Sequence, residues 1–232
     1  MNAKDRLIVA LDVKTVEEAR ALVDRLSGQA GMFKIGSQLF TAAGPALVRE
    51  IVGRGEKVFL DLKYHDIPHT VANAVAEASR LGVSLMTLHA LGGKAMMEAA
   101  VGALPAVGAR LLAVTILTSH DEDSLAAIGL EGPVADSVQR LARLAQQSGV
   151  DGIVASPLEA ELIRSACGPD FLIVTPGIRL GGAKADDQAR AAKPSAAIRA
   201  GASYVVVGRP IVEAADPVAA AAAVVRDMES VR

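Results

Sequence analysis

The sequence predicts an α/β protein that folds as a single-domain (β/α)8 TIM barrel, and three observations support this fold class. Short apolar runs rich in Val, Ile and Leu alternate with amphipathic, alanine-rich stretches along the chain. This alternation is typical of a parallel sheet whose strands are joined by crossover helices. Eight units of about 29 residues account for the 232 residues, near the lower size limit of the barrel. No linker or composition break divides the chain, so we expect residues 1–232 to form one domain.

The expected strands are buried on both faces, because their apolar runs lack a regular polar alternation. In chain order they span residues 7–12, 32–36, 57–63, 85–89, 110–117, 152–156, 171–175 and 204–208. An open, doubly wound parallel sheet is the main competing architecture, since the same alternation also permits it.

The expected helices carry recognisable start and stop signals. The first spans residues 15–26, where Thr15 and Glu18 have the spacing of a capping box. Several others begin at Pro or end in Gly, the usual asymmetry of helix ends. We expect eight helices, one after each strand, among them 45–55, 70–82, 134–149, 157–168 and 217–230.

The composition argues against several classes of protein. A net charge of −2 gives no overall attraction to nucleic acid or anionic membranes, and 3% aromatic content offers few base-stacking platforms. The single cysteine, Cys167, excludes an intramolecular disulfide. No basic-then-apolar leader begins the chain, and no apolar run reaches the roughly 18 residues of a membrane span. We expect a soluble, cytoplasmic protein.

Charged residues stand at the C-terminal ends of the first three strands, where barrel enzymes carry their chemistry. Asp12 ends the first strand, Lys34 lies in the second, Asp61 and Lys63 lie in the third, and Asp66 follows three residues later. Side chains alternate along a strand, so Asp61 and Lys63 point to the same side. Because sequential strands of a barrel are neighbours, we expect all five charges to cluster at one mouth.

A buried ion pair that only holds the barrel mouth together is the alternative, since buried charges need partners. Five alternating charges on three strands exceed what such a pair requires, so we interpret the cluster as an active site. A lysine among carboxylates keeps its proton, because opposite charge favours the ammonium form. It is suited to act as a general acid or to stabilise negative charge, and poorly suited to form a Schiff base.

Glycine and arginine follow the seventh and eighth strands, where barrels often hold phosphate. They form PGIR, ending at Arg179, and the pair Gly208-Arg209. One such turn alone would indicate a surface loop, but two at these positions favour a phosphate site, because backbone N–H groups and guanidinium forks both bind it. We expect the polar segment 180–190 to form a mobile lid, with Gln188 reaching the substrate.

The histidines give no persuasive metal site. His65 and His69 are four residues apart, but Pro68 between them disfavours a helical ligand pair. His89, at the end of the fourth strand, is more often a hydrogen-bonded residue of the mouth than a ligand. No glycine-rich nucleotide motif follows any strand. We therefore expect no obligatory metal, and the sequence offers no recognisable cradle for a nucleotide cofactor.

These motifs resemble those of the orotidine 5′-phosphate decarboxylases, in their shorter bacterial form, over essentially the whole chain. The matching segments, in the family's order, are VALD, FKIG, FLDLKYHDIPHTV, TILTS, PGIR, DDQAR and VVVGRPI. One departure is Lys193-Pro194 after the expected lid, where a Thr-Pro is usual. The resemblance implies conversion of orotidine 5′-monophosphate to UMP and carbon dioxide, the last step of de novo pyrimidine synthesis, by a homodimer without a cofactor.

Residue roles follow from the same resemblance. Lys63 is matched with the proton donor to C6 of the pyrimidine, and Asp61 and Lys34 are matched with its charged partners. Asp66 is matched with an aspartate that the second subunit contributes, with Thr70 close by. The matched ligand positions are Asp12 for the ribose, Thr118 near the pyrimidine, and Arg179, Gln188, Gly208 and Arg209 for the phosphate and lid.

Two other hypotheses remain open. A sugar-phosphate decarboxylase or aldolase of the same barrel superfamily also carries an Asp-x-Lys pair, but such enzymes typically need magnesium. A phosphate-ligand binding module would bind UMP tightly without releasing carbon dioxide from orotidine 5′-phosphate. The intact DLKYHDIP, PGIR and DDQAR segments and the complete set of charges favour the decarboxylase.

Overall fold

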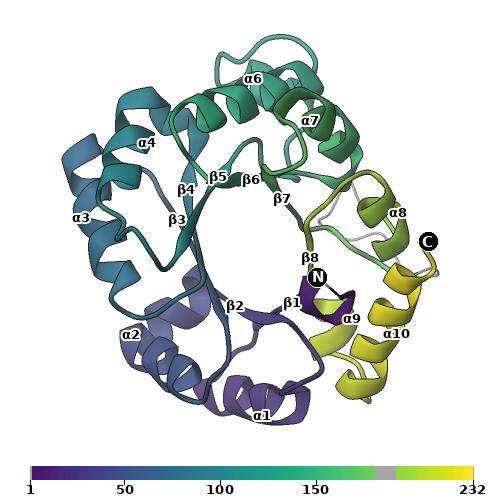
Figure 1. The fold of residues 1–232 in the computed structure, drawn as a ribbon. Coiled ribbons are helices and arrows are strands. Elements are labelled where there is room, and N and C mark those ends of the chain that lie inside the picture. The colour runs from purple at the N-terminus through teal and green to yellow at the C-terminus, as the bar shows by residue number, and fades with distance from the viewer. Residues whose placement is uncertain (1, 181–191, 232) are drawn as a thin grey trace.

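Eight parallel strands close into a barrel in which each strand pairs with the next and β8 pairs with β1 (Figure 1). The computed structural model describes residues 2–180 and 192–231. This arrangement confirms the predicted (β/α)8 barrel and excludes the open sheet. The strands are β1 (Leu7–Ala10), β2 (Met32–Gly36), β3 (Val58–Tyr64), β4 (Leu85–His89), β5 (Arg110–Val114), β6 (Gly152–Val154), β7 (Leu172–Thr175) and β8 (Tyr204–Val207).

Helices surround the barrel, and within the described ranges one main helix follows each strand (Figure 1). These are α1 (Val16–Leu26), α2 (Ser37–Gly53), α3 (Pro68–Ser79), α4 (Gly93–Gly102), α6 (Val134–Gln147), α7 (Ala160–Cys167), α8 (Pro194–Arg199) and α10 (Pro217–Glu229). Short helices α5 (Glu122–Ala126) and α9 (Arg209–Val212) add to the predicted set. The described part of the chain also contains three short 3-10 helices: η1 (Lys4–Arg6), η2 (Ala90–Gly92) and η3 (Pro157–Glu159).

Local sequence explains where the first two helices begin. Thr15 caps α1: its hydroxyl accepts a hydrogen bond from the Glu18 N–H, and the Glu18 carboxylate accepts one from the Thr15 N–H, as predicted. Helix α2 was expected to begin at Pro45 but begins at Ser37, because two helical segments meet at Gly44. Gly44 has a φ of 62°, which glycine tolerates, and Pro45 then starts the second segment without needing an N–H partner.

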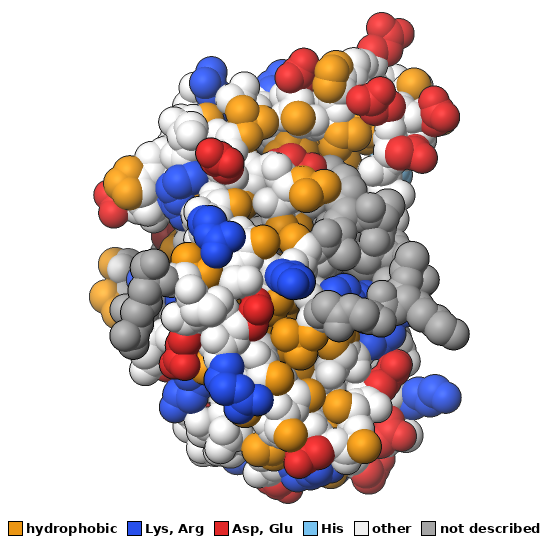
Figure 2. Space-filling view, turned by 90° about the vertical axis from the view of Figure 1, so that its right-hand side faces the viewer, with side chains coloured by type: hydrophobic (Ala, Val, Ile, Leu, Met, Phe, Trp, Pro, Cys, Tyr) orange, Lys and Arg blue, Asp and Glu red, His pale blue; other side chains and the backbone are white. Residues whose placement is uncertain are grey.

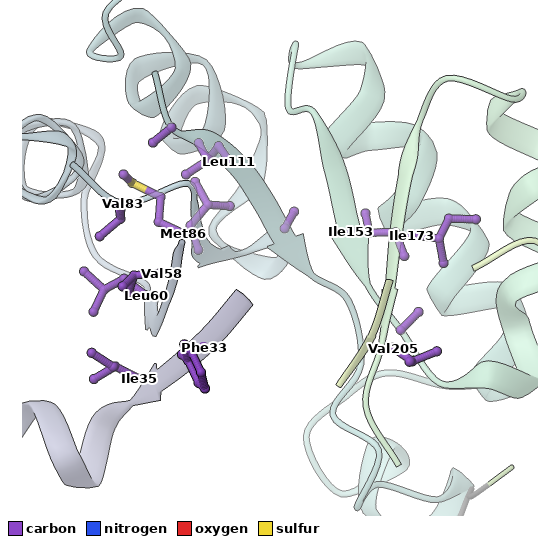
Figure 3. Packing of buried hydrophobic residues seen from close by; sticks show 14 of the residues in the cluster. Phe33, Ile35, Val58, Leu60, Val83, Met86, Leu111, Ile153, Ile173 and Val205 are labelled. Atoms are coloured by element: carbon purple, nitrogen blue, oxygen red, sulfur yellow. The ribbon is translucent and has the colours of Figure 1, made fainter. Parts of the chain in front are cut away.

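The hydrophobic core has two layers, because successive side chains of each strand point to opposite faces. The outer layer packs the barrel against its helices, and Figure 3 shows it for strands β2 to β8. The inner layer fills the barrel with Ile8, Ala10, Met32, Phe59, Leu85, Leu112, Val174 and Val206. On β2, β3 and β4 the next residue with the same orientation is polar: Lys34, Asp61 and Thr87, all buried. The alternation of side chains along each strand therefore points these polar groups toward the barrel interior, at its C-terminal mouth.

The outer surface mixes charges of both signs. On the face around α8 and α10, acidic and basic side chains are interspersed with hydrophobic ones (Figure 2). Among the helices in the described part of the chain, none combines the length and the apolar character that crossing a bilayer requires.

Candidate active site

A pocket of about 540 Å³ opens at the C-terminal ends of the strands. Inner-layer side chains such as Phe59 and Val206 form part of its lining, so the packed barrel closes its inner end. The polar lining comes from loops and strand ends on both sides of the barrel: Asp12, Lys34, Asp61, Lys63, Thr118, Ser119, Arg179, Arg209 and Glu213. The pocket therefore brings together residues from the first and the last parts of the sequence, such as Asp12 and Glu213.

Four of the five predicted charges form a continuous chain of ion pairs, which we call the ion-pair chain (Asp12, Lys34, Asp61, Lys63). Lys34 Nζ lies 3.1 Å from Asp12 Oδ1 and 3.5 Å from Asp61 Oδ2. Lys63 Nζ lies 2.8 Å from the same Asp61 Oδ2. One carboxylate oxygen thus serves two ammonium groups, and the signs alternate along the whole set.

Burial decreases along the ion-pair chain toward its two ends. The side chains of Lys34 and Asp61 are 11% and 12% exposed, whereas Lys63 is 34% and Asp12 is 54% exposed. The paired centre is therefore withdrawn from water, while the Lys63 ammonium remains accessible from the pocket. A reacting group that enters the pocket can reach Lys63 without disturbing the buried pair.

The carboxyl group of Asp61 is ionised because its partners outweigh its burial. Burial by itself raises the pKa of Asp61, but the charges of Lys34 and Lys63, with hydrogen bonds from Lys63 and Thr87, hold it below the ordinary value. The negative charge is thus built into the folded site rather than acquired on ligand binding.

Strand β3 departs from regular geometry at the site. Its pairing with β4 shifts register between Leu60, which faces Met86, and Tyr64, which faces Leu88. Three residues of β3 therefore stand opposite Thr87 alone. Lys63, the last of the three, has a φ of 53°, in the left-handed region that a residue with a Cβ rarely adopts. Such departures re-aim side chains next to active sites.

Close packing around Lys34 depends on a glycine. Gly36 follows Lys34 by two residues on β2 and so has the same orientation. A Cβ at Gly36 would lie 3.1 Å from Lys34 Nζ and 3.4 Å from Asp12 Oδ1. The absence of a side chain there leaves the space in which the ammonium reaches the Asp12 carboxylate.

Asp66, the fifth predicted charge, lies outside the cluster. Strand β3 ends at Tyr64, and Asp66 lies in the following loop, where its Oδ1 accepts a hydrogen bond from the Ile67 N–H at 2.6 Å. Asp66 and Thr70 are both exposed, and neither is part of the pocket lining. The expectation that all five charges of one chain share a mouth was therefore wrong for Asp66.

Two arginines, from the ends of β7 and β8, line the same pocket. Arg179 follows β7, and its backbone N–H donates to the carbonyl oxygen of Ala192, whose own N–H donates to that of Gly177. These bonds fasten the PGIR turn to the start of the segment before α8. Arg209 and Gly208 follow β8 and line the same pocket. The segment expected to form a lid, including Gln188, lies almost entirely outside the described residues.

Thr118 lines the pocket as expected, and three further polar residues were not anticipated. Ser119 and Glu213 also line it. Thr87 bonds both Asp61 and the backbone of Lys63 from beneath the lining. A polar residue at an inward position of the apolar run LMTLH was a signal that could have identified Thr87.

The two histidines near the mouth lie beside each other. The rings of His65 and His89 have centroids 5.5 Å apart. Burial chiefly lowers the pKa of His89, and the nearby His65 and Lys63 act in the same direction, against Asp61. Nδ1 of His89 has no hydrogen-bond partner among the described residues. The prediction that His89 is a hydrogen-bonded residue of the mouth is therefore wrong for this nitrogen atom. Within residues 2–180 and 192–231, no cluster of three or more His, Cys, Asp or Glu could hold a metal ion.

Comparison with known proteins identifies close sequence relatives. The model of the orotidine 5′-phosphate decarboxylase / HUMPS family matches residues 5–224. An orotidine 5′-phosphate decarboxylase from Trichlorobacter lovleyi is 54% identical over 231 residues, covering 97% of this chain and 96% of the relative. The enzyme of the same name from Moorella thermoacetica is 52% identical over 240 residues, covering 100% of this chain and 95% of the relative.

Solved structures agree with these relatives. The crystal structure of orotidine 5′-phosphate decarboxylase from Lactobacillus acidophilus superimposes with a TM-score of 0.85 at 39% identity, covering 96% of this chain and 98% of that one. A structure described as an uncharacterized conserved protein from Geobacillus kaustophilus gives a TM-score of 0.84 at 36% identity, covering 96% and 99%.

Proposed function

We propose that this chain, which belongs to the orotidine 5′-phosphate decarboxylase / HUMPS family, converts orotidine 5′-monophosphate to UMP and carbon dioxide, the last step of de novo pyrimidine nucleotide synthesis. The observation that carries the proposal is the ion-pair chain, which ends in a partly exposed lysine inside a pocket that two arginines also line. Relatives more than 50% identical over nearly their full length are named as this enzyme, which supports it further.

The reaction demands electrostatic stabilisation from the protein. Cleavage of the bond between C6 and the carboxylate leaves an electron pair on C6 that lies in the ring plane and cannot delocalise into the π system. Positive charge oriented before the reaction is the effective way to stabilise such a carbanion. In the proposed mechanism the Lys63 ammonium faces C6, donates its proton there as carbon dioxide departs, and regains a proton from water.

Asp61 and Lys34 would hold Lys63 ready for this step. Asp61 Oδ2 anchors the Lys63 ammonium at 2.8 Å, and Lys34 neutralises the charge that Asp61 would otherwise leave buried. These ion pairs hold the groups in fixed positions, so little reorganisation is needed when the carbanion forms. Proximity of Asp61 to the departing carboxylate would add repulsion in the ground state.

The remaining contacts would bind the substrate far from C6. We assign the phosphate to Arg179, Gly208 and Arg209, because guanidinium groups and backbone N–H groups both bind phosphate oxygens. Asp12 is assigned to the ribose and Thr118 to the pyrimidine, in keeping with their places in the pocket lining. Gln188 is proposed to approach the phosphate from the lid segment. Binding energy from the remote phosphate can then assist the chemical step.

A homodimer with shared active sites completes the proposal. Asp66 and Thr70 are exposed and are absent from the lining of their own pocket, which suits a contribution to the pocket of a second subunit. Large apolar side chains stand exposed nearby, with Ile67 at 66% and Leu91 at 41%. A contiguous exposed apolar patch with polar residues at its rim is typical of a surface that a protein partner covers.

The direct test follows the loss of orotidine 5′-phosphate absorbance with purified protein, in the presence and absence of excess chelator. We expect full turnover in both, and no UMP formation by Lys63→Ala although circular dichroism shows it folded. Activity that disappears with chelator would favour a magnesium-dependent sugar-phosphate enzyme instead. Tight UMP binding without carbon dioxide release would favour a binding module, and retained turnover by Lys63→Ala would refute the mechanism.

A further inference from the structure

The hydroxyl group of Thr87 connects the two residues of the Asp61–Lys63 pair. It donates a hydrogen bond to Asp61 Oδ1 at 3.0 Å and accepts one from the backbone N–H of Lys63 at 2.9 Å. Thr87 lies on β4 with an exposed fraction of 0%, so water does not compete for either bond. The partners fix the direction of each bond, because a backbone N–H can only donate and an ionised carboxylate can only accept.

The irregular segment of β3 explains why this hydroxyl is needed. Asp61, Leu62 and Lys63 stand opposite Thr87 alone, so the ladder between β3 and β4 is interrupted there. The Lys63 N–H bonds a side-chain oxygen in place of a strand carbonyl. Buried N–H groups are almost always paired, and this bond supports the strained left-handed backbone of Lys63.

The second bond controls how the carboxylate of Asp61 is turned. With Oδ1 held by Thr87, Oδ2 is the oxygen that faces both ammonium groups, at 2.8 Å from Lys63 and 3.5 Å from Lys34. One hydroxyl therefore orients both the acidic partner and the backbone that supports the lysine.

We propose that Thr87 is a positioning residue, whose hydroxyl sets the Asp61 carboxylate and the Lys63 backbone in the geometry that the reaction uses. This inference rests on the proposed decarboxylation, in which Lys63 donates the proton. Thr87 lies outside the pocket lining, so its loss leaves the substrate contacts in place. The effect is therefore expected on kcat, because a small misplacement of a reacting group lowers the rate more than the affinity.

Three variants separate this role from ordinary packing. Thr87→Val keeps the shape but removes the hydroxyl, and Thr87→Ser keeps the hydroxyl. Thr115→Val is the control: it removes a buried hydroxyl, on a residue that is 1% exposed, which donates to the Val154 carbonyl oxygen at 3.0 Å. We expect Thr87→Val to lose kcat about 10- to 100-fold with KM within about threefold. Thr87→Ser and Thr115→Val should stay within about threefold of wild type. Equal losses in Thr87→Val and Thr115→Val, or no rescue by serine, would overturn the proposal.

A pH profile gives a readout that packing alone would not change. Asp61 is faced by Lys34 from β2, Lys63 from β3 and His89 from β4, and the hydrogen bond from Thr87 is among the contacts that lower its pKa. Without that bond the pKa of Asp61 rises. We therefore expect the acid limb of kcat to move to higher pH in Thr87→Val, whereas an unmoved limb would contradict the assigned role.

A crystal structure of Thr87→Val tests the geometry independently of any reaction. We expect the Lys63 backbone to leave the left-handed region, or the contact between Lys63 Nζ and Asp61 Oδ2 to lengthen beyond hydrogen-bonding distance. Unchanged positions of both residues would refute the inference even if kcat falls. If wild-type protein fails to turn over orotidine 5′-phosphate, the proposed function fails, while this structural comparison still decides whether Thr87 sets the geometry.

Discussion

Replacing Asp61 with asparagine removes the negative charge that separates two ammonium groups while keeping the shape of the side chain. At an effective dielectric constant of about 20, unit charges at the observed 2.8 Å and 3.5 Å attract with about 6 and about 5 kcal/mol. The cost of withdrawing these charges from water offsets most of that attraction. Removal of one partner from a buried pair typically costs 3–5 kcal/mol. Lys34 retains Asp12 at 3.1 Å, so we expect a loss near the lower end, about 3 kcal/mol.

The assay is urea unfolding at neutral pH, followed by far-ultraviolet circular dichroism because the chain has no Trp. Protomer concentration is held constant, since association would shift the apparent stability. Asp24→Asn is the matched control: Asp24 pairs with Arg54 at 2.7 Å on the surface, where the two side chains are 66% and 37% exposed. We expect that control to lose less than about 1 kcal/mol. Equal losses in the two variants would refute the reasoning that the ion-pair chain is a coupled, buried unit.

Three further predictions concern assembly, substrate binding and pH. Lys63→Ala and Asp66→Ala should each be inactive alone, and mixing them in equal amounts should restore roughly a quarter of wild-type turnover after subunit exchange. About half of the dimers are then mixed, and one of the two sites in each mixed dimer is intact. No recovery of turnover would exclude shared sites. Arg209→Ala should raise KM about 10-fold or more in steady-state assays through loss of a bidentate phosphate contact, and an unchanged KM would place the phosphate elsewhere. The pKa of Asp61 is lower in the folded state than in the unfolded state. The ionised carboxylate therefore stabilises the folded protein at pH values above the ordinary aspartate pKa, and this stabilisation is lost as the pH falls through the pKa that Asp61 has in the folded state. The stability difference between wild type and Asp61→Asn should therefore narrow from neutral pH to a pH of about 3 in urea unfolding, and a constant difference would contradict it.

The sequence predicted the barrel well because its signals are local. Apolar runs placed every strand within a few residues of its observed bounds, and the Thr15 capping box fixed the start of α1. The start of α2 was missed because Gly44-Pro45 indicates a helix start, and here it joins two helical segments instead. Helix α5, capped by Asp121, was missed because five residues are too few for hydrophobic periodicity to emerge.

The site was predictable where side-chain alternation along a strand decides direction. Lys34 and Asp61 face the barrel interior because they follow Met32 and Phe59 at a spacing of two. Alternation says nothing once the strand has ended, which is why Asp66 was wrongly expected to join the same cluster. The position of Asp66 depends on the loop between β3 and α3, and no periodic signal encodes that loop.

The irregularity at the end of β3 links the fold to the proposed chemistry. In a regular strand, residues two apart have parallel side chains and about 7 Å between their Cα atoms, so a short aspartate and a long lysine would extend side by side. The register shift and the φ of 53° at Lys63 break that arrangement, and the Lys63 ammonium lies 2.8 Å from Asp61 Oδ2. The strained backbone of Lys63 is stabilised by a neighbouring strand, through the hydrogen bond between the Lys63 N–H and the Thr87 hydroxyl on β4. The orientation of Lys63 thus depends on Thr87, an uncharged residue of the neighbouring strand β4. A search of the sequence for charged motifs could not find Thr87 for that reason.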